Sequence, residues 1–150
     1  MAEKRAQDEI LSQLRQICAE AGIRLTHQRL EIFKEMLSAK DHPSAESIYA
    51  RLKGRVPTIS LDTVYRTLAT FERLGLLKKL YLLDDSARFD PNMEAHHHFV
   101  CTKCKKIIDF LWPQFEELEL PPGVAGIGTP LEQQVQVLGI CKECLDGRED

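Results

Sequence analysis

The sequence of 150 residues contains no apolar run long enough to cross a bilayer and no stretch of low complexity. It has one tryptophan and little excess of charge of either sign, with a formal net charge of -3. Its polar first ten residues lack the apolar core of a secretory signal. These absences argue against a membrane protein. With 43% hydrophobic and 29% charged residues, the chain is expected to be globular, as one domain or two small ones.

Cysteine is also scarce, and the five cysteines are an odd number that does not suit a framework of disulfides. Together with the missing secretory signal, this predicts a reducing compartment and therefore a cytoplasmic protein. In such a compartment, spaced cysteines bind metal more often than they pair as disulfides.

The small net charge hides an asymmetry between the two parts of the chain. Residues 1–91 carry fifteen basic and thirteen acidic side chains, whereas residues 92–150 carry five and ten. A polyanionic partner is therefore expected to meet the first part. We expect two domains with these bounds: residues 1–91 for DNA binding, ending in a hinge, and residues 92–150 for dimerisation and metal binding.

Residues 1–75 are expected to form four helices. Apolar residues at three- and four-residue steps indicate the first, which carries Cys18 on its apolar stripe and ends near Gly22. The other three each follow a side chain that can cap a helix N-terminus, namely Thr26, Ser44 and Ser60. Leu30, Phe33 and Leu37 are the core residues expected on the second helix. On the fourth, which ends at Gly75, Arg66 should point away from the apolar stripe and Tyr65 should lie on its flank.

A β-hairpin is expected after the fourth helix, from strands within residues 76–83 and 87–90 and a turn at Asp84-Asp85-Ser86. Three or four short helices followed by a hairpin are typical of a winged helix-turn-helix. The second segment should contain strands at 96–101, 105–112 and 132–140, with two helical turns at 114–120 that stop at Pro121-Pro122. The fold class is therefore α+β: an N-terminal winged helix-turn-helix followed by a small α/β unit.

Four cysteines form two C-x2-C pairs, Cys101 with Cys104 and Cys141 with Cys144. Each pair follows a strand, so two such knuckles can complete a tetrahedron of thiolates with no open position, as in structural zinc sites. Bound metal would stabilise a domain with a small core. Iron would use the same donors. Redox chemistry is less favoured, because neither pair is expected at a helix start after a strand. Cys18 is expected to be a core residue.

A second cluster combines histidines with carboxylates. In a strand, alternate residues share a face, so His96 and His98 point one way and His97 the other. Two imidazoles are half of a transition-metal site, and the remaining ligands could come from His42, Asp90 and Asp109. Three imidazoles and two carboxylates suit Fe(II), Mn(II) or Zn(II). The alternative is that the histidines only form a solvated strand edge.

The sequence resembles the ferric uptake regulator family of bacterial repressors along nearly its whole length. The motifs that carry the resemblance are GIRLTHQR, HPSAESIYARL, SLDTVYRTLATFERLGLL, HHHFVCTKCKKIIDF and GICKEC. Aspartate at positions 90 and 109 resembles the peroxide-stress regulator branch, because many iron-sensing members have glutamate at both places. Glu132 and Gln133 stand where many members have histidine, so a third metal site is not expected.

The resemblance implies a homodimer that binds a palindromic operator when metal is bound, without a small organic ligand or a membrane. It assigns structural Zn(II) to the four cysteines. It assigns the regulatory Fe(II) or Mn(II) to five residues: His42, Asp90, His96, His98 and Asp109. The fourth helix would enter the major groove, with Tyr65 and Arg66 touching bases and with four residues contacting the DNA backbone, Arg24, Arg29, Lys78 and Lys79.

Our hypothesis is a repressor, not an enzyme, in which Fe(II) reacts with hydrogen peroxide. The resemblance implies that His42 and His96 are the ligands that are oxidised. One alternative is a repressor that responds to iron or zinc without sensing peroxide. A mononuclear iron enzyme could use a similar ligand set, but the basic outer face of the fourth helix would then lack a role. A zinc-stapled protein-interaction module would leave the histidines and aspartates without one.

Overall fold

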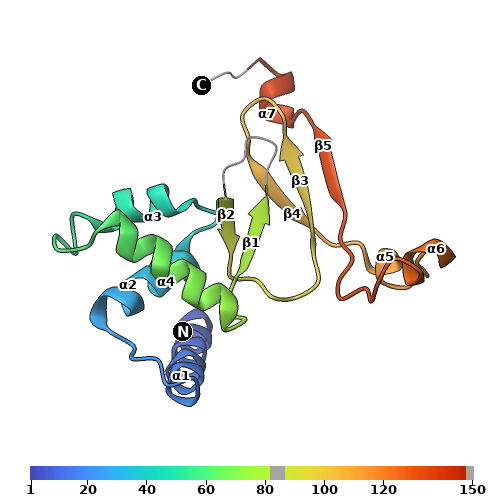
Figure 1. Ribbon diagram of the computed structural model, residues 1–150. Coiled ribbons are helices and arrows are strands. Elements are labelled where there is room, and N and C mark those ends of the chain that lie inside the picture. The colour runs from blue at the N-terminus through green and yellow to red at the C-terminus, as the bar shows by residue number, and fades with distance from the viewer. Residues whose placement is uncertain (82–86, 148–150) are drawn as a thin grey trace. The chain divides into compact units, whose positions relative to one another are not determined.

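The computed structural model describes residues 1–81 and 87–147, which belong to two compact units, Met1–Met93 and Glu94–Asp150 (Figure 1). The first unit contains α1 (Ala2–Glu20), α2 (His27–Ser38), α3 (Ala45–Leu52), α4 (Leu61–Arg73), β1 (Lys78–Tyr81) and β2 (Ala87–Asp90). The second contains β3 (His97–Cys101), β4 (Ile107–Phe110), α5 (Pro113–Glu116), α6 (Pro122–Ala125), β5 (Gln136–Gly139) and α7 (Lys142–Leu145). No helix in these described ranges is both long and apolar enough to span a bilayer.

The starts of α2, α3 and α4 are set by the three capping side chains expected from the sequence. Thr26, Ser44 and Ser60 each accept a hydrogen bond from the backbone N–H three residues on, at 3.0 to 3.2 Å. These bonds satisfy amide groups that have no partner inside the helix. Gly75 follows α4 with a φ of 74°, a conformation that glycine adopts at no steric cost.

The core of the first unit lies where α1, α2, α3 and α4 meet. Phe33 on α2 and Phe71 on α4 pack edge to face, with ring centroids 5.3 Å apart. Cys18 is 1% exposed and belongs to this core, as expected. The prediction of which α2 side chains are buried is partly wrong. Ile32 and Met36 are fully buried, whereas Leu30 and Leu37, which were expected in the core, are only partly buried. Because α2 packs against both α3 and α4, the face between those neighbours is the one removed from water.

The hairpin of β1 and β2 completes the winged helix expected from the sequence. The strands are antiparallel, with Lys78 opposite Asp90 and Lys79 opposite Phe89. The N–H of Phe89 donates to the carbonyl of Pro43 at 3.1 Å, so β2 also holds the loop before α3. The turn expected at Asp84-Asp85-Ser86 lies outside the described residues.

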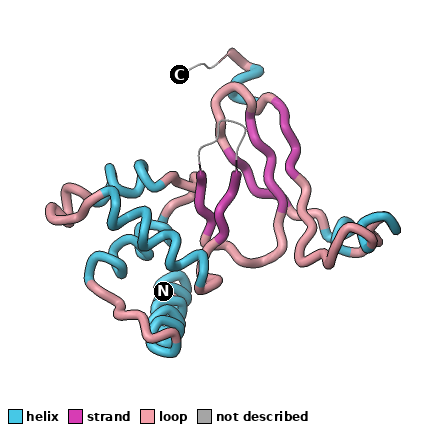
Figure 2. Tube along the Cα trace, viewed as in Figure 1, coloured by secondary structure: helices cyan, strands magenta, loops and turns pink. Residues whose placement is uncertain are grey.

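The second unit is built on a three-stranded sheet in the order β4-β3-β5 (Figure 2). The central strand β3 is antiparallel to β4 and parallel to β5. The helical turns expected over 114–120 are shorter than expected, because α5 ends at Glu116. The two prolines do not end helical structure, because Pro122 begins a further short helix, α6. Proline suits the first turn of a helix, where a backbone N–H would have no partner inside the helix. Among the described residues of this unit, the buried apolar side chains besides three cysteines are Val100 and Ile107.

Candidate metal centres and DNA-binding face

The sheet of the second unit brings the four cysteines of the two C-x2-C pairs together. Cys101 ends β3, Cys104 lies in the following turn, Cys141 follows β5, and Cys144 lies in α7. Their sulfur atoms all lie within 4.8 Å of one another. The sulfur atoms of Cys101 and Cys144 are 3.8 Å apart, and so are those of Cys104 and Cys141. Four converging sulfur donors match a closed tetrahedral zinc site.

Backbone amides prepare this cluster for a cation. The N–H groups of Cys104 and Cys141 each donate to the sulfur of Cys101 at 3.4 Å, and these bonds lower the pKa of the Cys101 thiol to about 6. Burial, together with the neighbouring sulfur atoms, raises the pKa of Cys144 to about 12. A negative charge already present on one sulfur opposes a second, so the full set of thiolates requires a compensating metal ion.

The sequence argument against redox chemistry is wrong for the second pair. Cys141 is the N-cap residue of α7 and follows β5, so this pair does lie at a helix start after a strand. However, all four sulfur atoms lie within 4.8 Å of one another, and each of these two cysteines also lies 3.8 Å from a cysteine of the first pair, Cys144 from Cys101 and Cys141 from Cys104. This common cluster fits four ligands around one ion better than two separate redox pairs.

Within the second unit, two histidines converge on one aspartate as the alternation of β3 predicted. The rings of His96 and His98 are 4.6 Å apart. Their Nε2 atoms lie 3.9 Å and 3.4 Å from Oδ1 of Asp109, which is paired with His98 in the strand register. Nδ1 of His96 lies 2.6 Å from the carbonyl oxygen of Glu94. A carbonyl only accepts, so Nδ1 carries the proton and Nε2 has the lone pair that a metal requires.

Within the first unit, His42 and Asp90 form a second group. Nε2 of His42 is 3.2 Å from Oδ2 of Asp90, and both residues are buried. Oδ1 of Asp90 accepts the N–H of Asn92 at 2.9 Å. Arg88 fixes the loop that presents the histidine, by donating to the carbonyls of His42 and of Asp41. The five expected regulatory ligands are thus divided between the units, two in the first and three in the second.

His97, for which the sequence suggested no role, has a structural one. It points to the opposite face of β3 from its neighbours, and its Nδ1 accepts the N–H of Val135 at 2.9 Å. Its ring packs 4.9 Å from that of Phe115 and 5.6 Å from that of Phe110. The bond to Val135 holds the segment that leads into β5.

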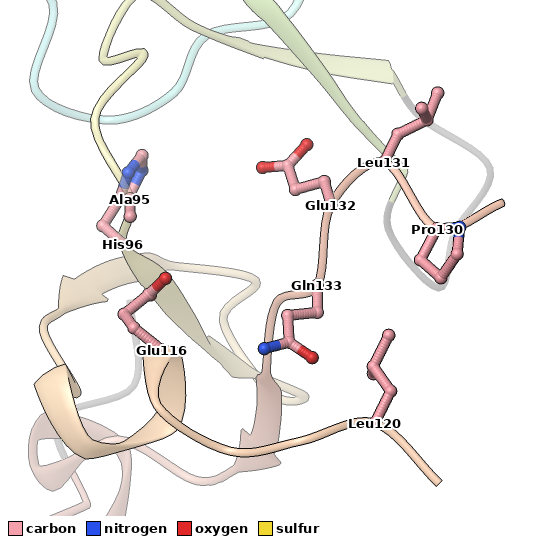
Figure 3. A pocket seen from close by; sticks show the side chains of 8 residues that line it. All are labelled: Ala95, His96, Glu116, Leu120, Pro130, Leu131, Glu132 and Gln133. Atoms are coloured by element: carbon pink, nitrogen blue, oxygen red, sulfur yellow. The ribbon is translucent and has the colours of Figure 1, made fainter. Parts of the chain in front are cut away.

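A cavity of about 350 Å³ lies in the second unit on the side of α5 (Figure 3). Its lining residues are Ala95, His96, Glu116, Leu120, Pro130, Leu131, Glu132 and Gln133. The amide of Gln133 donates to the carbonyls of Phe115 and Leu118, each at 3.5 Å. Gln133 therefore connects the segment before β5 to the end of α5.

The exposed side of α4 carries the two residues expected to touch bases. Tyr65 is 44% exposed, and its hydroxyl donates to the carboxylate of Glu46 on α3. This bond lowers the pKa of Glu46 and raises that of Tyr65. Arg66 is exposed, and its Nε is 2.9 Å from Oδ2 of Asp62, one turn earlier on the same helix. The sequence indicated that Asp62 lies beside Arg66 on the outward face of the helix, and their four-residue spacing is a recognisable signal of an ion pair; it did not indicate the bond from Tyr65 to Glu46.

The sequence model of the ferric uptake regulator family matches residues 20–121. The chain belongs to the ferric uptake regulator family. Its similarity to family members extends beyond that range. A peroxide-responsive repressor of Staphylococcus epidermidis is 40% identical over 125 residues, which cover 83% of each chain. The solved ferric uptake regulator of Francisella tularensis, with iron, is 28% identical with a TM-score of 0.71, over 83% of this chain and 96% of that one.

A second solved member of the family supports the fold. The Helicobacter pylori ferric uptake regulator has a TM-score of 0.76 and 24% identity, over 92% of this chain and 93% of that one. Membership of the family makes this protein a metal-binding regulator of transcription, as expected from the sequence.

In this member of the family, the four residues expected to contact the DNA backbone differ in their surroundings. Arg24 is exposed. Arg29 is half-buried, and its guanidinium donates to the carbonyl of Arg24, so it supports the loop before α2. Lys78 and Lys79, on β1, are half-buried.

Proposed function

We propose that this protein is a metal-dependent, DNA-binding repressor that senses hydrogen peroxide through oxidation of its own ligand histidines. The observation that carries the proposal is the convergence of two buried imidazoles on Asp109, separate from a four-cysteine cluster. The Staphylococcus epidermidis relative is named a peroxide-responsive repressor, which supports the same function. A repressor acts where the chromosome lies, so the cytoplasm is the proposed location.

The four-cysteine cluster is proposed to hold Zn(II) as a structural ion. Sulfur is the donor that zinc prefers in closed four-coordinate sites, and the amide bonds to Cys101 favour its thiolate form. Such a site has no position for a substrate, so its task is to stabilise the fold.

The regulatory ion, Fe(II) or Mn(II), is proposed to be shared by the two units. His42 and Asp90 would come from the first unit, and the other three ligands, His96, His98 and Asp109, from the second. Nitrogen and oxygen donors in this ratio suit both metals. An ion that needs ligands from both units fixes their relative orientation, and so the spacing of the two DNA-binding units in a dimer.

Peroxide sensing is proposed to act through this ligand set. Hydrogen peroxide would give one oxygen atom to a ligand imidazole, at a ring C–H that becomes C–O, and its other oxygen would leave as water; bound Fe(II) would supply the redox chemistry that cleaves the O–O bond. The proposed targets are His42 and His96. An oxidised imidazole is a weaker donor, so the units lose their common ligand set and the protein leaves its operator.

DNA binding is proposed to use a palindromic operator and a homodimer, with α4 of each subunit in the major groove. Tyr65 and Arg66 would contact base edges. Four residues would contact phosphates: Arg24, Arg29, Lys78 and Lys79. The first part of the chain has only a small positive excess, so one subunit alone would bind weakly.

The test compares the Fe(II) and Mn(II) forms of the protein before and after dilute peroxide, by electrophoretic shift of palindromic duplexes and by mass spectrometry. We expect peroxide to release only the Fe(II) form from DNA. The tryptic peptides spanning residues 41–51 and 89–103, which contain His42 and His96, should gain one oxygen atom.

Two controls make this result specific. Met93 is 44% exposed and lies in the same peptide as His96, so fragment spectra and a Met93→Leu variant must place the oxygen on the histidine. The exposed His27 lies outside both ligand groups and should stay unmodified. If peroxide releases the Fe(II) and Mn(II) forms equally, or neither, the protein responds to metal supply and peroxide sensing by ligand oxidation is refuted.

A further inference from the structure

An ion pair lies on the outward side of α4, beside the proposed base-contacting tyrosine. Nε of Arg66 is 2.9 Å from Oδ2 of Asp62, and the side chains are 80% and 70% exposed. An acidic side chain on a surface that is to meet DNA opposes binding, because it repels phosphates. The proposed function therefore leaves the presence of Asp62 on this side of the helix unexplained.

The geometry of the Asp62–Arg66 ion pair leaves the two terminal nitrogens of the guanidinium available to contact a base. A guanidinium carries donors at Nε and at two terminal nitrogens, in a fixed plane. The contact with Asp62 is made through Nε, and in a planar guanidinium the end formed by the two terminal nitrogens faces about 120° away from the Nε–H bond. Two parallel donors of this kind match O6 and N7 of guanine in the major groove.

The pair also restricts a side chain that would otherwise be mobile. A long exposed arginine samples many rotamers, and ordering it on binding reduces affinity. Tyr65, the next residue back along the chain, is held in a similar way, because its hydroxyl donates to Glu46 on α3. Both proposed base-contacting residues are thus positioned by a carboxylate.

We propose that Asp62 is a positioning residue that orients Arg66 to read a guanine, and that it thereby determines operator specificity. The inference rests on the proposed DNA binding but does not depend on which metal or signal controls it. A purely electrostatic role predicts something different. Removing the negative charge would then raise affinity for all duplexes alike and leave base preference unchanged.

The experiment measures base preference with the full-length, Mn(II)-loaded protein. A pool of duplexes randomised over about 20 base pairs, which accommodates two half-sites one helical turn apart, is selected by binding and sequenced. Substituted versions of the selected duplex are then compared by competition. A bidentate arginine–guanine contact is expected to give a preference of about 5- to 150-fold over other bases at one position of each half-site.

Three variants separate the roles. Asp62→Asn should lower the guanine preference about three- to tenfold, because one charge-assisted hydrogen bond orients the arginine. Arg66→Lys keeps the charge but lacks the planar pair of donors, so it should lower the preference more than Asp62→Asn does. Glu72→Gln removes the same charge from an exposed site on α4, about 120° around the helix from Arg66, and should leave base preference unchanged.

A double variant tests whether Asp62 acts through Arg66. In an Arg66→Ala background, adding Asp62→Asn should not alter base preference further. A further change, for example in a preference for cytosine, would mean that Asp62 reads a base directly and would overturn the inference. So would a guanine preference that survives Asp62→Asn. If the wild type selects no duplex, the proposed DNA binding fails; if it selects one and Asp62→Asn keeps the guanine preference, only this inference fails, so the two failures are distinguishable.

Discussion

Replacing Cys104 with serine is the most direct test of the four-cysteine cluster. Cys104 is the exposed member of the four, so the smaller serine removes little buried surface. Any large effect must therefore come from the lost ligand. Structural zinc contributes an apparent binding free energy of about 10–16 kcal/mol, which is about 2.5–4 kcal/mol for each of four ligands.

This loss is large for the second unit. Globular units of about 60 residues have a free energy of unfolding of about 3–9 kcal/mol. Among its described residues, the buried apolar side chains apart from cysteine are Val100 and Ile107, and burying each contributes only about 1.5–3 kcal/mol. Cys104→Ser should therefore remove a large part of the stability of this unit. The first unit should be unaffected, since its core contains no residue of the cluster.

The two units can be followed separately in one denaturation experiment. Trp112 is the single tryptophan of the chain and packs 5.5 Å from Phe115, so its fluorescence reports the second unit. Far-ultraviolet circular dichroism is dominated by α1, α2, α3 and α4, which all belong to the first. In urea, the fluorescence transition of Cys104→Ser should move to much lower concentration, while the helical transition stays.

The matched control is Lys103→Ser, which places the same side chain next to Cys104 without removing a ligand. It should bind zinc and unfold like the wild type. If Cys104→Ser keeps a full equivalent of zinc and an unchanged fluorescence transition, the assignment of a structural four-cysteine site is refuted.

Other predictions follow from individual contacts. Ser60→Ala should lower the free energy of unfolding of the first unit by about 1 kcal/mol, measured by urea titration, because α4 loses its N-terminal cap. Phe71→Ala should cost about 3–5 kcal/mol in the same assay, because it leaves a cavity in the core; a smaller change than in Ser60→Ala would contradict this. The hydrogen bond from Arg51 lowers the pKa of Asp41 in the folded protein. The stabilisation that this bond gives the folded first unit is therefore complete above about pH 4, the ordinary pKa of aspartate, and is lost as the pH falls through the lowered pKa. Asp41→Asn should therefore cost at most about 0.5–1 kcal/mol near neutral pH, and its stability should fall less than that of the wild type in acid. The pKa of Cys101 is lowered to about 6, so its thiolate is stable at neutral pH and is protonated below that value. Zinc added to the zinc-free protein should then bind more weakly as the pH falls below about 6, and an affinity that stays unchanged would contradict this.

The sequence determined the features that depend on neighbours along the chain. A capping hydroxyl binds an amide three residues away, so the starts of three helices could be predicted from Thr26, Ser44 and Ser60. Strand alternation is equally local, and it placed His96 and His98 on one face and His97 on the other. The C-x2-C spacing likewise indicated a metal cluster before any fold was known.

Only the tertiary structure decided the features that depend on contacts between distant segments. The packing of α2 against two other helices buried Ile32 and Met36 more deeply than the expected Leu30 and Leu37. Glu46 reaches Tyr65 because α3 and α4 pack against each other. Cys101 acquires its low pKa partly from an amide forty residues later in the chain. Periodicity and spacing specify what one segment presents, but a hydrogen bond or a buried face also needs a partner, and the fold chooses that partner.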